Sequence, residues 1–160
     1  MSIAVFDIDG VVADVRHRLH HLHPRTSHAY KSWSGFFRDA ADDPLLDPGA
    51  RLARDLAERH EIVWLTGRPE WLRDVTDDWL RRHDLPGTEL HMRPDGDYRP
   101  ARSFKLTVLR RLAAREVAAF VDDDAEVVTA AEGAGFPAAL ADWVPRDAAL
   151  RDAQERLGRT

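Results

Sequence analysis

Two aspartates two residues apart follow an apolar run near the N-terminus, in "AVFDIDGVV" (residues 4–12). Strand side chains alternate between two faces, so Asp7 and Asp9 are expected to point into one shared space. Two like charges there need a cation, a proton or a polar partner, because otherwise they cost stability. An aspartate can also act as a nucleophile that forms an aspartyl-phosphate, while a second acid protonates the leaving oxygen and then activates water. The spacing therefore makes Asp7 a candidate nucleophile and Asp9 a candidate acid/base.

A second group of acids stands in "VDDD" (residues 121–124) after another apolar run. The chain has no cysteine, and a cluster of carboxylate oxygens suits Mg²⁺ rather than zinc. Asp7, Asp9, Asp122 and Asp123 are the candidate metal ligands. The alternative is helix capping, since Asp123 with Glu126 fits a capping box and Asp124 would serve equally well as a cap.

Candidate phosphate-binding groups lie in two further segments. Thr66 and Gly67 follow an apolar run and offer a hydroxyl and backbone N–H groups, although Thr-Gly is also an ordinary turn sequence. Ser103 is predicted to cap a helix, which places Lys105 in the first helical turn, where a cation opposes the helix dipole. A cation at this unfavourable position, at the same end of the fold as the acids, favours a functional role for Lys105. The alternative is a solvated surface lysine.

The elements that must position these residues alternate between strand and helix. Apolar runs predict buried strands at 3–8, 61–65, 89–92, 117–121 and 136–140. Helical spacing predicts helices at 50–60, 70–83, 104–115 and 125–135, with a helical tail after 145, and Trp71, Leu72, Val75, Trp79 and Leu80 on one helix face. The alternation predicts an α/β fold with a mostly parallel five-stranded sheet in a single domain, residues 1–160. In such sheets ligands bind beyond the carboxyl ends of the strands, where the candidate residues fall.

The remaining features narrow the class of protein. The 160 residues carry a net charge of −5, so contact with a phosphorylated partner must come from a local basic cluster. No apolar window is long enough for a membrane span and no leader pattern opens the chain, which favours a cytoplasmic protein without membrane contact. Residues 14–47 form a polar, histidine-rich insertion with a short helix expected near 32–40. It contains His17 and His21 at i,i+4 spacing, a weak zinc pattern, as well as His20, His23 and His28. A small cap-like insertion that leaves the site fairly open is the favoured interpretation.

The motifs "DIDGV" (7–11), "LTGRP" (65–69), Lys105 and "VDDD" (121–124) resemble the four motifs of the haloacid dehalogenase (HAD) superfamily in order and spacing. The resemblance covers roughly residues 3–140. It implies a Rossmann-like three-layer sandwich, Mg²⁺, Asp7 as nucleophile and Asp9 as acid/base, with Asp9 also ligating metal through its carbonyl. Family roles then fall on Thr66 and Lys105 as phosphate binders and on Asp122 and Asp123 as metal ligands. Val11 stands where many relatives carry threonine, and the third acid, Asp124, leaves open which two face the metal.

The segment "HMRPDGDYRPARSFK" (91–105), together with "LTGRP", is similar to the 3′-phosphatase domain of phage-type polynucleotide kinase-phosphatases. This similarity implies that Arg68, Arg93 and Arg99, beside Gly67, line the substrate side, and arginine is a preferred planar donor to phosphate oxygens. The alternative is a solvated, turn-rich loop. No GxxxxGK[ST] pattern occurs, so no kinase domain is expected in this chain.

The function expected from these residues is a Mg²⁺-dependent phosphomonoesterase that removes 3′-phosphates from DNA or RNA ends. A nucleotidase or small-metabolite phosphatase would use the same chemistry. A catalytically silent HAD-like binding module is a third alternative, although it would not need to retain both Asp7 and Asp9. The sequence does not fix the substrate or the oligomeric state, because a fold does not carry specificity by itself.

Overall fold

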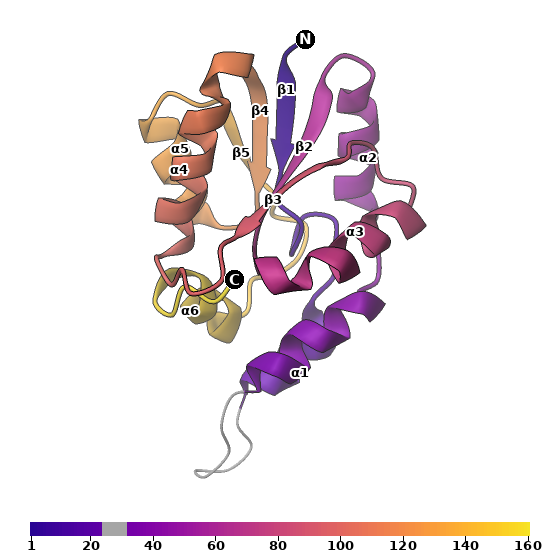
Figure 1. Ribbon diagram of the computed structural model, residues 1–160, viewed down its shortest axis with the longest axis vertical. Helices are drawn as coiled ribbons and strands as arrows, with labels where there is room; N and C mark the ends of the chain where they lie inside the picture. Colours follow the sequence, from indigo (N-terminus) through magenta and orange to yellow (C-terminus); the bar gives the residue numbers. More distant parts are fainter. Residues whose placement is uncertain (24–31) are drawn as a thin grey trace.

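Five parallel strands form one sheet at the centre of the molecule (Figure 1). The computed structural model describes residues 1–23 and 32–160. The strands lie in the order β3-β2-β1-β4-β5. Their bounds are β1 (Ile3–Phe6), β2 (Glu61–Pro69), β3 (Glu89–Arg93), β4 (Val117–Asp122) and β5 (Ala138–Leu140). The predicted parallel five-stranded α/β fold is thus confirmed, with β2 four residues longer than expected.

Helices cover both faces of the sheet, so each central strand is buried on two sides (Figure 1). One face packs against α2 (Asp47–Ala57) and α3 (Arg73–Arg82), the other against α4 (Ala101–Leu112) and α5 (Ala125–Gly133), and η4 (Ala113–Arg115) continues α4. Alternate residues of β1 divide accordingly: Phe6 joins the core beneath α2 and α3, and Val5 joins the core beneath α4 and α5. Burial on both faces explains why these strands read as continuous apolar runs.

One predicted helix start is wrong, and a second is confirmed. Helix α4 begins at Ala101 after Pro100 and has no side-chain cap, because the fixed φ of proline already sets the entry into the helix. Ser103 is therefore not a cap, and Lys105 lies in the second turn rather than the first, which weakens the argument from the helix dipole. Helix α5 begins at Ala125, as expected. Of the two candidate caps, Asp124 rather than Asp123 accepts the capping hydrogen bond, from the backbone N–H of Glu126 at 2.9 Å.

The apolar face predicted for the helix at 70–83, which corresponds to α3, is correct except for Trp71. Leu72, Trp79 and Leu80 are buried and Val75 packs against the same core, but the Trp71 residue is 57% exposed. The reason is local. Residues Glu70–Leu72 form a separate 3₁₀ turn, η3, so the 3.6-residue period of α3 does not extend back to Trp71.

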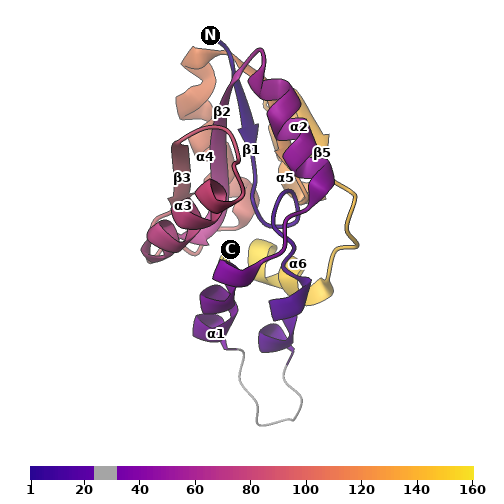
Figure 2. The same ribbon diagram turned by 90° about the vertical axis from the view of Figure 1, so that its right-hand side faces the viewer.

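The insertion and the C-terminal residues lie together at the carboxyl end of the sheet (Figure 2). The insertion contains η1 (Arg16–Leu22), α1 (Trp33–Arg38) and η2 (Asp39–Asp42), and α6 (Ala148–Glu155) packs against η1. The short helix expected near 32–40 is confirmed as α1. No helix in the described part of the chain is long and apolar enough to cross a bilayer.

His17 and His21, the two histidines at i,i+4 spacing, contact carboxylates. The ring Nε2 of His17 lies 2.7 Å from Asp43 Oδ1, and that of His21 lies 2.6 Å from Asp39 Oδ2. The two histidines thus contact different carboxylates, so their i,i+4 spacing does not direct them to one shared ligand. His28 lies outside the described residues.

Candidate active site

Lys105 joins the carboxylates that follow two neighbouring strands. Its Nζ lies 3.0 Å from Asp7 Oδ2, after β1, and 2.6 Å from Asp122 Oδ2, at the end of β4. All three side chains are buried. Burial and the neighbouring Asp122 raise the pKa of Asp7, and the ammonium of Lys105 acts against this rise. The two carboxylates raise the pKa of Lys105 despite its burial, so the lysine stays protonated.

Asp123 completes a group of three acids. Carboxylate oxygens of Asp7, Asp122 and Asp123 lie within 4.8 Å of one another. The Oδ1 atom of Asp123 is buried and has no hydrogen-bond partner, and burial together with Asp122 raises the pKa of Asp123 to about 7. Buried oxygens without partners are costly, and hard oxygen ligands are what a divalent cation such as Mg²⁺ requires. The three acids therefore fit a magnesium site.

The close approach of two loops at this group depends on Gly10. Its φ of +77° favours glycine, and a Cβ built there would lie 2.0 Å from Asp123 Oδ2. Asp124, in contrast, points away from the group. One of its oxygens caps α5, and the other lies 3.0 Å from Arg146 Nη2. The structure thus brings Asp122 and Asp123, but not Asp124, to Asp7.

Asp9 has cationic partners of its own. Its Oδ1 accepts hydrogen bonds from Arg68 Nη2 at 2.6 Å and from Arg18 Nη2 at 3.0 Å. Burial opposes the charged form, yet Arg68 and Arg18 lower the pKa of Asp9. Because β1 ends at Phe6, strand alternation does not carry through to Asp9, and the two aspartates of the motif bind different cations.

Arg18 and Asp43 are site residues that sequence reasoning missed. Asp43 accepts from Arg18 Nε at 2.8 Å and from Arg68 Nη2 at 2.9 Å, so these two arginines form one buried network with Asp43 and Asp9. Both missed residues come from the insertion, which reads as polar and turn-rich. No spacing or motif marks either residue, since the network forms only when the insertion folds against the sheet.

Thr66 and Gly67 lie beside Asp9 at the end of β2. The Thr66 hydroxyl accepts a hydrogen bond from the backbone N–H of Arg68 at 3.1 Å, in the part of β2 where the register with β3 shifts. Gly67 is covered by the C-terminal residue, because a Cβ built there would lie 2.1 Å from the carbonyl carbon of Thr160. The Thr160 hydroxyl also lies 3.5 Å from Asp9 Oδ2. Asp7 and Asp9 are each only 2% exposed, so the site is less open than expected from the short insertion.

The three predicted arginines take different positions. Arg68 is fully buried in the network around Asp9. Arg93 is also buried and donates to main-chain oxygens, among them that of Gly67 at 3.2 Å, and its Nη1 lies 3.9 Å from Asp97 Oδ1. Burial lowers the pKa of Arg93 to about 10. Arg99 is exposed and its side chain binds Asp97 and Thr107. The structure therefore brings Arg68 and Arg93, but not the Arg99 side chain, to the segment around Gly67.

The family model of the polynucleotide kinase PNKP phosphatase domain matches residues 1–139. This range includes every residue named in the candidate active site except Arg146 and Thr160. The chain belongs to this family. It is a phosphatase of the HAD type, and the resemblance of its four motifs is confirmed. No curated protein matches the sequence significantly.

Solved structures share the fold of this phosphatase. A chain of the Pnkp1/Rnl/Hen1 RNA repair complex superposes with a TM-score of 0.70 at 20% identity, over 87% of this chain and 42% of the other. The class C acid phosphatase from Bacillus anthracis gives 0.63 at 18% identity, over 80% and 53%. A haloacid dehalogenase-like hydrolase from Streptococcus pneumoniae gives 0.63 at 13% identity, over 98% and 92%. The phosphatase thus spans less than half of the RNA repair chain.

Proposed function

We propose that this phosphatase hydrolyses 3′-phosphate groups at nucleic-acid ends, with Mg²⁺ and through an aspartyl-phosphate intermediate. The observation that carries the proposal is the contact of Lys105 with both Asp7 and Asp122 beside the unpartnered oxygen of Asp123. It combines a nucleophile, a fixed cation and a set of hard oxygen ligands in one buried place. When bound by Asp7, Asp122 and Asp123, Mg²⁺ would supply positive charge to the carboxylates and to the phosphate oxygens.

In the first step, a carboxylate oxygen of Asp7 attacks the phosphorus, and the bond from phosphorus to the 3′ oxygen breaks. Asp9 gives its proton to the leaving oxygen, which departs as the 3′-hydroxyl. In the second step Asp9 takes a proton from water and the water oxygen attacks the phosphorus. The bond between the phosphorus and the Asp7 oxygen breaks, which releases inorganic phosphate and restores the free carboxylate of Asp7. Lys105 keeps the positive charge that both steps require next to Asp7.

The two roles of Asp9 place opposite demands on its protonation. Arg68 and Arg18 lower its pKa, which suits the base that activates water in the second step. The acid role needs a proton. A phosphate dianion bound beside Asp9 raises the pKa of the carboxyl by charge repulsion, so binding of the substrate favours the protonated form. Asp9 then loses its proton to the leaving oxygen in the first step and regains a proton from water in the second step.

Two arguments support a nucleic-acid end as the substrate. The family is the phosphatase domain of polynucleotide kinase PNKP, and a neighbour of similar fold belongs to an RNA repair complex. Because the net charge is −5, phosphate must be bound by local cationic groups. The buried arginines Arg68 and Arg93, beside Gly67, are the candidates for this role.

The test is phosphate release from DNA and RNA oligonucleotides with a 3′-phosphate, from their 5′-phosphate counterparts and from mononucleotides, with Mg²⁺ and with a chelator. We expect turnover of the 3′-phosphate substrates that disappears on chelation and returns with added Mg²⁺. Asp7→Asn, which keeps the side-chain volume, is the inactive control. Equal or better turnover of mononucleotides would favour a nucleotidase, and no turnover of any substrate would favour a binding module.

A further inference from the structure

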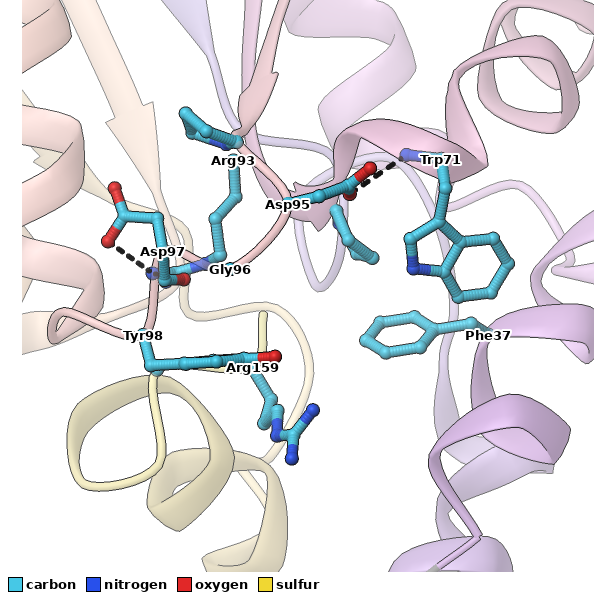
Figure 3. Close-up of a pocket in the computed structure, with 11 residues that line it drawn as sticks. Phe37, Trp71, Arg93, Asp95, Gly96, Asp97, Tyr98 and Arg159 are labelled. Atoms are coloured by element: carbon cyan, nitrogen blue, oxygen red, sulfur yellow. Dashed lines mark hydrogen bonds and ion pairs between the residues drawn. The ribbon is translucent and has the colours of Figure 1, made fainter.

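A pocket with aromatic walls lies next to the candidate active site (Figure 3). It has a volume of about 120 Å³. Its walls include Phe37 from α1, Trp71 from η3, Tyr98 from the loop after β3, and Arg159 from the C-terminal segment. None of these four residues has a role in the mechanism proposed above.

Trp71 and Tyr98 expose unusually large apolar surfaces. They are 57% and 56% exposed, and they make up two of the four large apolar residues that are exposed in the described part of the chain. Single exposed apolar residues are common on proteins, but two aromatic rings at one concave site indicate a binding function.

Both rings are held in place by other residues of the pocket lining. Trp71 packs edge to face on Phe37, with ring centroids 5.6 Å apart, and its backbone N–H donates to Asp95 Oδ1 at 3.2 Å. The guanidinium of Arg159 lies 4.6 Å from the Tyr98 ring centroid. These contacts fix the orientation of the aromatic walls before a ligand binds, which reduces the entropy lost on binding.

The pocket continues into the segment that surrounds Gly67. Arg93 lines the pocket and donates through Nε to the Gly67 carbonyl. Pro69, which ends the same "TGRP" segment, is also part of the wall. Thr160 packs against Gly67. A ligand with its phosphate beside Thr66 and Gly67 would therefore displace Thr160 and would place its next group toward the aromatic walls.

We propose that this pocket binds the nucleobase of the terminal nucleoside that carries the 3′-phosphate, by stacking on Trp71 and Tyr98. The inference rests on the proposed function. Every base has a π face, so stacking on aromatic side chains fits a ligand whose sequence varies. The charged residues of the lining, Arg93, Asp95, Asp97 and Arg159, fit a polar ring edge better than a purely apolar ligand.

The first experiment measures binding, so it does not depend on turnover. Isothermal titration of the Asp7→Asn variant compares a nucleoside 3′-phosphate with a sugar 3-phosphate that lacks the base. We expect the base to strengthen binding about 5- to 100-fold, the range found for aromatic stacking on one base. We expect Asp7→Asn/Trp71→Ala to lose this difference and Asp7→Asn/Trp71→Phe to keep most of it. Equal affinities for the two ligands in the Asp7→Asn variant would overturn the proposal.

The second experiment separates this inference from the proposed function. Two oligonucleotides with a 3′-phosphate differ only in whether the terminal residue carries a base, and the ratio of their kcat/KM values is measured. Trp71→Ala should bring the ratio close to one, whereas Leu140→Ala, a matched exposed apolar residue on β5, should leave it at the wild-type value. Turnover of both oligonucleotides at one rate by the wild type refutes the base pocket alone. Failure to hydrolyse either, with base-dependent binding intact, refutes the proposed reaction alone.

Discussion

The guanidinium of Arg68 lies 2.6 Å from the carboxylate of Asp9 and connects the segment after β1 with the segment at the end of β2. Arg68 is fully buried, and it also donates to Asp43 Oδ2 and to Thr76 Oγ1. The Arg68 side chain therefore holds Asp9, the candidate acid/base, against the candidate phosphate-binding segment around Thr66 and Gly67. The pair therefore has consequences both for stability and for catalysis.

Removal of the Arg68 guanidinium should destabilise the fold. Arg68→Ala leaves Asp9 and Asp43 buried with one cation fewer, and loss of one partner of a buried pair costs about 3–5 kcal/mol. Urea denaturation followed by circular dichroism measures the free energy of unfolding. Arg81→Ala is the control, because Arg81 pairs with Asp78 on the surface and such pairs contribute about 0–1 kcal/mol. Equal stabilities of the two variants would show that the network around Asp9 does not support the fold.

Loss of the Lys105 charge should impair catalysis strongly. Lys105→Met keeps the length of the side chain but leaves Asp7 and Asp122 without the ammonium 2.6–3.0 Å away. We expect kcat on the best substrate of the panel to fall about 100-fold or more, the effect of removing one electrostatic group that stabilises a transition state. Arg110→Met, an exposed cation on the same helix, should retain normal kcat. A kcat for Lys105→Met within a few-fold of the wild type contradicts the role of Lys105.

A methyl group at Gly10 should disturb the acid cluster. Gly10→Ala introduces a Cβ that meets Asp123 Oδ2, at a φ of +77° that L-residues rarely adopt. We expect a loss of stability above about 1 kcal/mol and a lower apparent affinity for Mg²⁺, measured from the dependence of activity on Mg²⁺ concentration. Gly133→Ala has open space around it and an ordinary φ in α5, so it should be neutral or stabilising. If the two variants behave alike, the close approach of Gly10 and Asp123 is not a constraint.

Glu155 should make the protein less stable as the pH rises. Burial and the neighbouring carboxylate of Asp124 raise its pKa to about 8, from an ordinary value of 4.5. Between these two values the folded state holds a proton that the unfolded state releases. The contribution of Glu155 is therefore greatest below pH 4.5 and is lost progressively toward pH 8.

Glu155→Gln tests this dependence, since glutamine keeps the shape and does not titrate. The free energy of unfolding of this variant, measured from pH 5 to 9, should fall less steeply than that of the wild type and should exceed it at pH 9. Glu132→Gln, at an exposed position on α5, should follow the wild-type curve. Parallel curves for Glu155→Gln and the wild type would contradict the raised pKa of Glu155.

The sequence alone determined the class of fold and the centre of the candidate site. Strands buried on both faces need continuous apolar runs, and helices need a 3.6-residue period, so both are written locally in the chain. Parallel strands end at the same edge, which is why Asp7, Lys105 and the acids after β4 were expected together and lie together. Local patterns failed at short range. The predicted cap Ser103 lies three residues after the observed cap Pro100, and Trp71 lies in the 3₁₀ turn before α3.

Only the tertiary structure decided what surrounds that centre. Arg18 from the insertion contacts Asp9, Asp43 from the insertion contacts Arg68, and Thr160 at the end of the chain contacts Asp9 and Gly67. It likewise separated Asp124 from the other acids and placed Trp71 beside a pocket. The physical reason is that such contacts depend on how the insertion and the C-terminal segment pack against the finished sheet, and no periodicity within either segment encodes that packing.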